Sequence, residues 1–276
     1  MAETSAIAWT DATFNAWIGC TEAGPGCVNC YARTLDSAKR WGGVTHWGVG
    51  VPRYRTSPSN WAKPISWNKK AEAAGRPLKV FCNSLGDVFD AEVDPQWRAD
   101  LFSLWRATPW LNWIVVTKRV PNIKKMIPDN WAYAFGNVGL VATVVDQDEM
   151  NRDGPRLLKI PAAWHGFSLE PQIGPVVIPG SFVAHPGSLW FITGGESRQR
   201  GGPEPREYDP VWAAILTQAC RDARKAGLPW FAFVKQTGAR PRGLQPPRDG
   251  AGADPEAWPA DLRVRDFPPE LCTRAA

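Results

Sequence analysis

The feature that most constrains the fold is a series of short apolar runs, each of which ends in polar residues. Most of these runs are followed by a helical or loop stretch. Apolar strands that alternate with amphipathic helices are typical of a parallel sheet. The seven candidate strands are residues 12–19, 78–84, 111–119, 137–145, 165–171, 188–197 and 229–238.

Helical patterns lie between several of these strands. We expect helices over 27–41, 94–108 and 209–227. Asp94 is a suitable N-cap with Pro95 in the first helical position, and Gly227 ends the last of the three. About seven βα repeats, without a Gly-x-Gly-x-x-Gly after the first strand, favour a full or partial βα barrel over a dinucleotide-binding sheet. The predicted class is therefore α/β, with about six to seven parallel strands.

The chain divides by composition into a barrel domain and a tail. Residues 1–240 are expected to form the barrel, with the Trp- and Pro-rich segment 41–77 as an insertion or lid, and 241–276 form a Pro- and Arg-rich extension. No run approaches the roughly 18 apolar residues of a membrane span. The start of the sequence lacks the pattern of a secretory signal. We therefore expect a cytoplasmic protein with no membrane partner.

Three of the six cysteines, Cys20, Cys27 and Cys30, fall within eleven positions after the first strand. In a reducing compartment, a tight cysteine cluster more often binds metal than forms disulfide bonds. The remaining three are interpreted as buried small apolar residues or inert thiols. They are Cys82, Cys220 and Cys272.

The C-x6-C-x2-C spacing leaves two kinds of metal site open. Structural zinc needs four ligands, so a distant residue would have to complete the site. The candidates for that position are Cys82, Cys272, His46, His165 and His185. Alternatively, a 4Fe–4S cluster held by three thiolates leaves one iron free to bind S-adenosylmethionine (SAM), which one electron cleaves to a 5′-deoxyadenosyl radical.

The opening N-x-W-x-G-C…P-G-C-x-x-C-Y-A resembles the cysteine loop of the radical SAM superfamily, whose usual spacing is C-x3-C-x2-C. It resembles more closely a phage- and prophage-associated radical SAM family long catalogued as a domain of unknown function. Five further motifs agree with that family, and the similarity covers residues 9 to 240: "NSLGDVFD" (83–90), "VTKR" (116–119), "SLEP" (168–171), "GGES" (194–197) and "VKQTG" (234–238). The resemblance implies a radical SAM barrel in which Cys20, Cys27 and Cys30 bind a 4Fe–4S cluster, with SAM as the second cofactor.

The five motifs lie at the carboxyl ends of predicted strands, where βα barrels build their sites. Asn83, Ser84 and Asp87 could hydrogen-bond the amino group or ribose of SAM, or form a helix cap or turn instead. The run Gly194, Gly195 and Glu196 resembles the superfamily motif that contacts the SAM amino group. Because this run lies near the sixth strand instead of the second, Glu196 is also a candidate for the substrate or the adenosyl end.

Charged groups at other strand ends are the catalytic candidates. Lys118, Arg119 and Lys235 offer cations to a carboxylate or phosphate, and Gln236 offers an amide. Glu170 is an acceptor for an ammonium, a hydroxyl or a base edge. We therefore select Lys118, Lys235 and Glu170 as the catalytic residues.

The resemblance also implies a substrate, because phage-borne relatives take part in thymidine hypermodification in viral DNA. A glycine joined to the base through nitrogen would become joined through its α-carbon. The chain would then be an isomerase for modified DNA or a modified nucleotide, located in the host cytoplasm if it is phage-encoded, with flavodoxin or ferredoxin as electron donor. The alternatives are a radical SAM enzyme for RNA, a nucleotide or a small metabolite, and a non-catalytic zinc-bearing nucleic-acid-binding protein.

The net charge of +5 permits an anionic partner but does not establish one. Sixteen Trp is far more than usual, and four of them near loops are candidates to stack on a planar substrate: Trp41, Trp47, Trp61 and Trp67. Basic residues in the same segment and two later runs are candidates for phosphate contacts, or else belong to a solvated lid. They are Arg53, Arg55, Lys63, Lys69, Lys70, 198–206 and 239–248.

Overall fold

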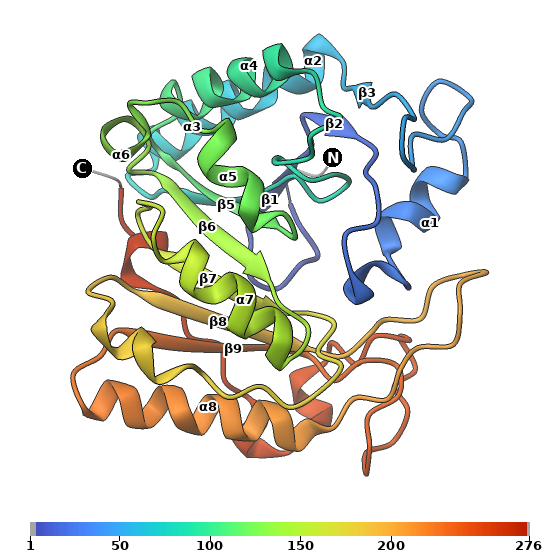
Figure 1. Cartoon of the computed structure of the whole chain (residues 1–276), viewed down its shortest axis with the longest axis vertical. Coiled ribbons are helices and arrows are strands. Elements are labelled where there is room, and N and C mark those ends of the chain that lie inside the picture. The colour runs from blue at the N-terminus through green and yellow to red at the C-terminus, as the bar shows by residue number, and fades with distance from the viewer. Residues whose placement is uncertain (1–3, 275–276) are drawn as a thin grey trace.

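A computed structural model describes residues 4–274; residues 1–3 and 275–276, the outer ends of the predicted segments 1–240 and 241–276, lie outside this part. Seven parallel strands form one curved sheet in the order in which they occur along the chain (Figure 1). β1 and β9 are its edges, so the barrel is partial. The strands are β1 (Ala12–Phe14), β4 (Leu78–Cys82), β5 (Leu111–Thr117), β6 (Val138–Thr143), β7 (His165–Leu169), β8 (Leu189–Gly194) and β9 (Trp230–Gln236).

All seven predicted strands are confirmed, and so is the α/β partial-barrel class. Every residue of β6, β7 and β8 is buried, which explains their near-continuous apolar sequences. The first predicted strand, 12–19, is divided in two. After β1 the chain forms β2 (Trp17–Ile18), which pairs antiparallel with β3 (Tyr54–Arg55) outside the main sheet.

Helices cover the outer face of the sheet (Figure 1). They are α3 (Lys63–Ala73), α4 (Pro95–Arg106), α5 (Val120–Met126), α7 (Gln147–Leu157) and α8 (Pro210–Lys225), with the shorter α2 (Pro58–Trp61) and α6 (Trp131–Ala134). The short α1 (Tyr31–Ser37) follows the cysteine loop and lies apart from this layer. The predicted caps are confirmed, because the Asp94 carboxylate accepts from Gln96 N at 2.8 Å, and Gly227 after α8 has φ +84°. Of the helix expected over 27–41, only α1 forms.

Two apolar cores lie on the two faces of the sheet. The outer core, between sheet and helices, contains Trp105 and Trp113. The inner core contains Trp164 and Trp190, which lie at the amino ends of β7 and β8. A Cβ atom on Gly139 would lie 2.0 Å from Trp164, so the indole occupies the space above that glycine. Aromatic rings therefore fill the amino-terminal half of the barrel.

The segment 41–77 contains β3, α2 and α3. Trp67 is 2% exposed and belongs to the outer core, so the expectation that it stacks on a substrate is wrong. By contrast, Trp47 pairs with Cys20 in an isolated bridge beside the cysteine loop.

The segment from residue 241 to 274 consists of loops and three 3-10 turns that are hydrogen-bonded to the barrel. Val234 N donates to Val264 O at 2.8 Å, and Trp190 Nε1 donates to Asp266 O at 2.9 Å. Between residues 4 and 274, none of the helices has the length and hydropathy needed to cross a membrane.

Candidate functional site

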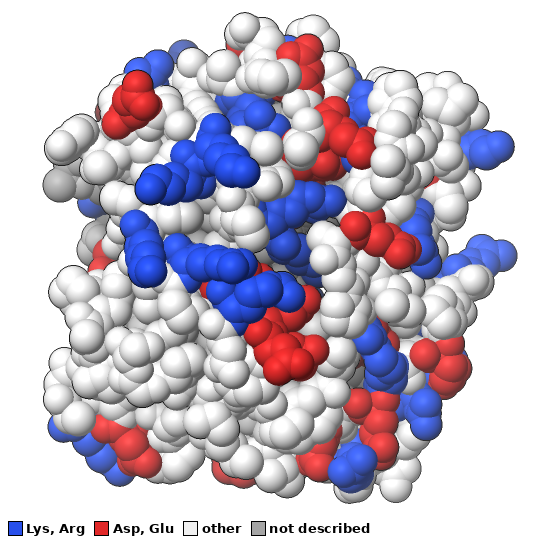
Figure 2. Space-filling model, viewed as in Figure 1, with Lys and Arg blue, Asp and Glu red and all other residues white. Residues whose placement is uncertain are grey.

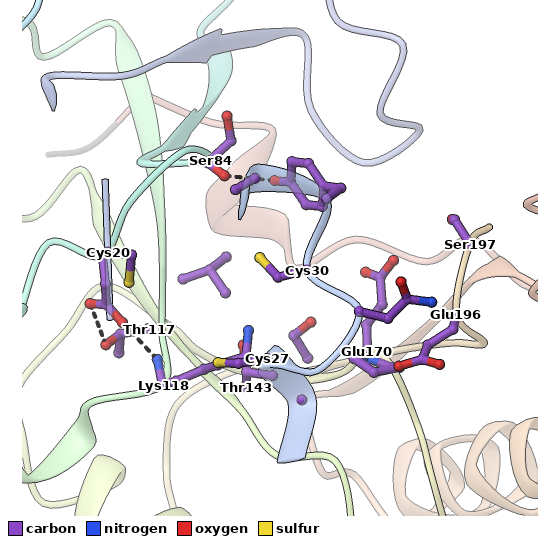
Figure 3. A pocket seen from close by; sticks show the side chains of 18 of the residues that line it. Cys20, Cys27, Cys30, Ser84, Thr117, Lys118, Thr143, Glu170, Glu196 and Ser197 are labelled. Carbon is purple, nitrogen blue, oxygen red and sulfur yellow. Dashed lines mark hydrogen bonds between the residues drawn. The ribbon is translucent and has the colours of Figure 1, made fainter. Parts of the chain in front are cut away.

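A cavity of about 360 Å³ lies at the carboxyl end of the sheet. Its walls come from the cysteine loop, from the ends of the strands and from the segment before β1. Figure 3 shows Cys20, Cys27 and Cys30 around this space, with Glu170 and Glu196 on the side away from Cys20. The structure therefore brings the three predicted thiols to one cavity.

The three cysteines occupy different parts of one loop. Cys20 follows β2, Cys27 ends a 3-10 turn (Pro25–Cys27), and Cys30 immediately precedes α1. Cys20 and Cys27 are buried, Cys30 is half-buried, and all three are free thiols. The Gly-Pro-Gly turn brings the second thiol close to the loop between β6 and α7 and to the residue after β5, since a Cβ atom on Gly26 would lie 2.8 Å from Val145 Cγ1 and 3.2 Å from Lys118 Cε.

Close backbone packing fixes where this loop begins. Gly19 N donates to Leu85 O at 2.9 Å, and Gly19 pairs with Gly86 in an isolated bridge. Gly19 has φ +108°, and a Cβ atom there would lie 2.3 Å from His46 O. Only glycine fits this position, because the space is filled and L side chains disfavour that φ. The cysteine loop is thereby held against the loop after β4.

Arg53 joins the cysteine loop to the two loops beside it. Its guanidinium donates to Asp90 Oδ2 at 3.0 Å, Thr21 Oγ1 at 2.6 Å and Gly48 O at 3.0 Å. Arg53 is 6% exposed. The expectation that Arg53 contacts phosphate is therefore wrong, because its charge is buried and paired.

Arg119 holds the first cysteine from the opposite side. Its guanidinium donates to Cys20 Sγ at 3.3 Å, Thr21 O at 2.6 Å and Asp87 Oδ2 at 3.1 Å. Burial raises the pKa of the Cys20 thiol to about 12, although the neighbouring Arg119 favours the thiolate. Asp87 also accepts from Thr117 Oγ1 at 2.8 Å. Asp87 thus orients Arg119, and Arg119 in turn orients Cys20.

Asn83 and Ser84 line the cavity, but the chain itself engages their polar atoms. Asn83 Nδ2 donates to Trp17 O at 2.9 Å, and its Oδ1 accepts from Ala16 N at 2.8 Å. Ser84 O accepts from the Tyr31 hydroxyl at 2.8 Å, which ties α1 to this loop. In this conformation both residues support the wall of the cavity.

Glu170 and Lys235 form an ion pair across the cavity wall, with side chains 16% and 21% exposed. Glu170 directly follows β7, and Lys235 lies near the end of β9. Lys118 also lines the cavity and extends toward Cys27 (Figure 3). Within residues 4–274 its ammonium has no carboxylate partner. The site therefore contains one paired and one unpaired lysine.

The Gly194–Glu196 run forms the end of β8 and the turn beyond it. A β-bulge lies at Gly194, and a Cβ atom on Gly195 would lie 2.8 Å from Thr237 O, so this turn packs closely on the end of β9. Both carboxylate oxygens of Glu196 are engaged by Arg206, through its backbone N at 2.8 Å and its Nε at 3.0 Å. The Glu196 carboxylate is therefore already paired, although the residue lines the cavity.

Three further residues line the cavity: Trp47, which was a stacking candidate, and Trp9 and Asn29, which were not selected from the sequence. The indole nitrogens of both tryptophans and both amide atoms of Asn29 are buried, and none has a hydrogen-bond partner in the described chain. A buried polar group without a partner is costly, so such atoms mark places where a ligand can bind. Asn29 lies between two of the cysteines, a signal that could have identified it. Trp9 gave no such signal.

Comparison with known proteins places the chain in a family and identifies one structural similarity. A family model described as "Protein of unknown function (DUF5131)" matches residues 4–258. No curated protein matches. Among solved structures, a double mutant of spore photoproduct lyase with bound AdoMet and dinucleoside spore photoproduct is similar, with a TM-score of 0.43 and 13% identity. The match covers 66% of this chain and 56% of that one, so this chain spans little more than half of the lyase.

Proposed function

The chain belongs to the DUF5131 family of proteins of unknown function, and we propose that it is a radical SAM enzyme whose cluster is bound by Cys20, Cys27 and Cys30. The observation that supports this most is that three thiols from one loop face a single cavity. The described residues that line it include no other cysteine and no histidine. A three-thiolate set of this kind suits a 4Fe–4S cluster with one iron left open for a small molecule.

A single zinc ion and a 4Fe–4S cluster place their thiolate ligands differently. Zinc ligands at about 2.3 Å from a tetrahedral ion stand less than about 4 Å apart. Among the described residues, no group of three or more His, Cys, Asp or Glu could hold a metal ion as it stands. In a 4Fe–4S cluster each thiolate binds a different iron, so the ligands surround the cluster instead of converging on one point.

A 4Fe–4S cluster held by Cys20, Cys27 and Cys30 would supply the electron for cleavage of a carbon–sulfur bond of SAM. The chain's own residues would bind and orient the substrate and exclude water from the site. Trp9, Phe81 and Val116 form an apolar wall that keeps water from the reacting carbon. Asn29 and Trp47 offer free hydrogen-bonding groups near the thiols.

We further propose that the substrate is a thymidine whose 5-methyl carbon carries a glycine through nitrogen, and that the product carries it through the α-carbon. This is an isomerisation, so atoms and electrons balance without another reactant. The unpaired Lys118 ammonium would bind the glycine carboxylate. Glu170, oriented by Lys235, would accept from the glycine amine. An electron donor such as flavodoxin or ferredoxin stays a prediction.

The test is anaerobic reconstitution followed by iron analysis and reduction with dithionite in the presence of SAM. The wild type should contain about four iron and four sulfide per chain and release 5′-deoxyadenosine. Cys27→Ala should lose both properties. Cys220→Ala is the matched control, because Cys220 is fully buried in the outer core. Stoichiometric zinc without iron, or an unchanged cluster in Cys27→Ala, would overturn the proposal.

The substrate is tested separately with an oligonucleotide that contains the glycyl-modified thymidine. Nucleosides released by digestion should include an isomer of equal mass that elutes differently. SAM cleavage without this isomer would refute the isomerase proposal and leave the radical SAM proposal intact.

A further inference from the structure

Lysine and arginine side chains gather across the middle of one face of the molecule (Figure 2). The helices α5 and α7 pack against each other. The lysine and arginine side chains on these two helices and directly after α7 are all exposed, and we call them the basic band. The band consists of Lys124, Lys125, Arg152, Arg156 and Lys159.

Among the described residues, three of the five cations of this band have no carboxylate partner. Within the described chain, Lys124, Lys125 and Lys159 form no ion pair. Arg152 and Arg156 both pair with Asp153, but that carboxylate is 3% exposed, so the cations lie above it and face solvent. An anion that approaches these five residues therefore meets positive charge, whereas the first turn of α7, with Asp148 and Glu149, is acidic.

Three arginines of the basic runs selected from the sequence differ in this respect. Arg198 pairs with the exposed Glu204, Arg242 pairs with Glu207 and Asp209, and Arg55 pairs with Asp100. These three arginines each have a carboxylate partner at the surface. The band is thus a better candidate for phosphate contacts than Arg55, Arg198 and Arg242.

The two helices that carry the band begin beside the cavity, and the band lies on their later turns and directly after α7. α5 starts at Val120, two residues after Lys118, which lines the cavity. The start of α7 packs on the cysteine loop, since a Cβ atom on Gly24 would lie 2.8 Å from Glu149 Oε1. A strand lying along these helices would therefore reach the opening at one end.

We propose that the basic band binds the sugar-phosphate backbone of a nucleic acid strand whose base enters the cavity. This inference rests on the proposed function, because it takes the cavity as the place of reaction. A cavity of about 360 Å³ suits a ligand of nucleotide size. Neither α5 nor α7 exposes a large apolar side chain, as a membrane-binding helix would.

The test is fluorescence anisotropy with a labelled 20-nucleotide single strand and its duplex, at several salt concentrations. The variant Lys124→Gln, Lys125→Gln, Lys159→Gln should bind the single strand at least about tenfold more weakly. Its slope of log affinity against log salt should fall by about 2, since each lost phosphate contact contributes about 0.7. The matched control, Lys63→Gln, Lys69→Gln, Arg106→Gln, removes the same charge elsewhere and should change affinity less than about twofold.

Equal affinities for the band variant, the control and the wild type would overturn the inference, provided that circular dichroism shows the variants folded. Binding to vesicles of phosphatidylserine and phosphatidylcholine, without binding to either oligonucleotide, would overturn it in favour of a membrane partner. Wild-type iron content and 5′-deoxyadenosine release are measured in parallel. If the wild type has neither iron nor 5′-deoxyadenosine release, the proposed function is refuted. If it has both, and the band variant binds nucleic acid as tightly as the wild type, only the inference about the band is refuted.

Discussion

The two ends of the barrel hold cavities of similar size and opposite character. The carboxyl end has about 360 Å³ lined by thiols, an ion pair and polar atoms without partners. The amino end has about 410 Å³ lined largely by aromatic and aliphatic residues, among them Trp131, Phe135 and Trp164. The residues at the carboxyl ends of the strands are thus available for chemistry, whereas those at the amino ends fill the core.

The two histidines that line the amino-end cavity, His165 and His185, have a structural role. His165 Nε2 lies 2.7 Å from Ile160 O, which places its proton on that nitrogen. Burial lowers the pKa of His165 to about 4, and burial also lowers the pKa of His185. Both rings are therefore neutral near pH 7, and they pack edge to face at 4.9 Å.

The largest expected effect is at the carboxyl end. Glu170→Gln removes the carboxylate that pairs with Lys235 and accepts from the substrate amine, so we expect turnover to fall about 100-fold, or about 2.7 kcal/mol of transition-state stabilisation. The free energy of unfolding should change by less than about 1 kcal/mol, since the pair is partly exposed. Steady-state kinetics and urea denaturation measure the two. His185→Gln, at the other end, is the control for turnover, and a large loss of activity there would break the contrast.

Next in size is a substitution at the amino end. Gly139→Ala places a Cβ atom 2.0 Å from the Trp164 ring, and this overpacking should cost about 2–3 kcal/mol of unfolding free energy. Urea denaturation gives the value. At Gly174, nothing lies within 4 Å of an added Cβ atom, so Gly174→Ala serves as control. Iron content per folded chain should stay at the wild-type level; loss of the cluster would mean that the two ends are coupled.

The smallest expected effect is on the pH dependence of stability. The unfolded state takes up a proton on His165 below its ordinary pKa of 6.5, whereas the folded state does so only near 4. Stability should therefore fall as the pH falls from 7.5 to 5.0, by about 2 kcal/mol from this group. His165→Gln should show a correspondingly smaller loss over the same range. Parallel urea titrations of both proteins at the two pH values decide the matter, and equal losses would contradict this assignment.

Local sequence was enough to predict the sheet. Each strand is a buried run whose apolar character reflects its own position, and the residues after it reach the same end of the barrel. The cysteine loop was found for the same reason, since all three thiols lie within eleven residues and face one cavity.

Contacts between distant segments were not predictable from the sequence. Glu170 and Lys235 are 65 residues apart, and nothing in either motif indicates that they pair. Glu196 looked like a free acceptor, although its partner Arg206 lies only ten residues later in the same β8–α8 connection, because nothing in either motif shows how that connection turns back. The basic band combines two helices, neither of which is strongly basic along its own sequence. Trp67 looked like a loop residue, because its segment is rich in Pro and Gly, yet it belongs to a core-facing helix.

The unsatisfied amide of Asn29 makes the free protein less stable than its packing alone would allow. A side chain that carries a donor and an acceptor, both shielded from solvent, loses the hydrogen bonds that it had in water and regains them only when a complementary molecule arrives. Occupancy of the cavity and rigidity of the segment between the second and third cysteines are therefore coupled. This segment is expected to become most ordered when the cavity is filled.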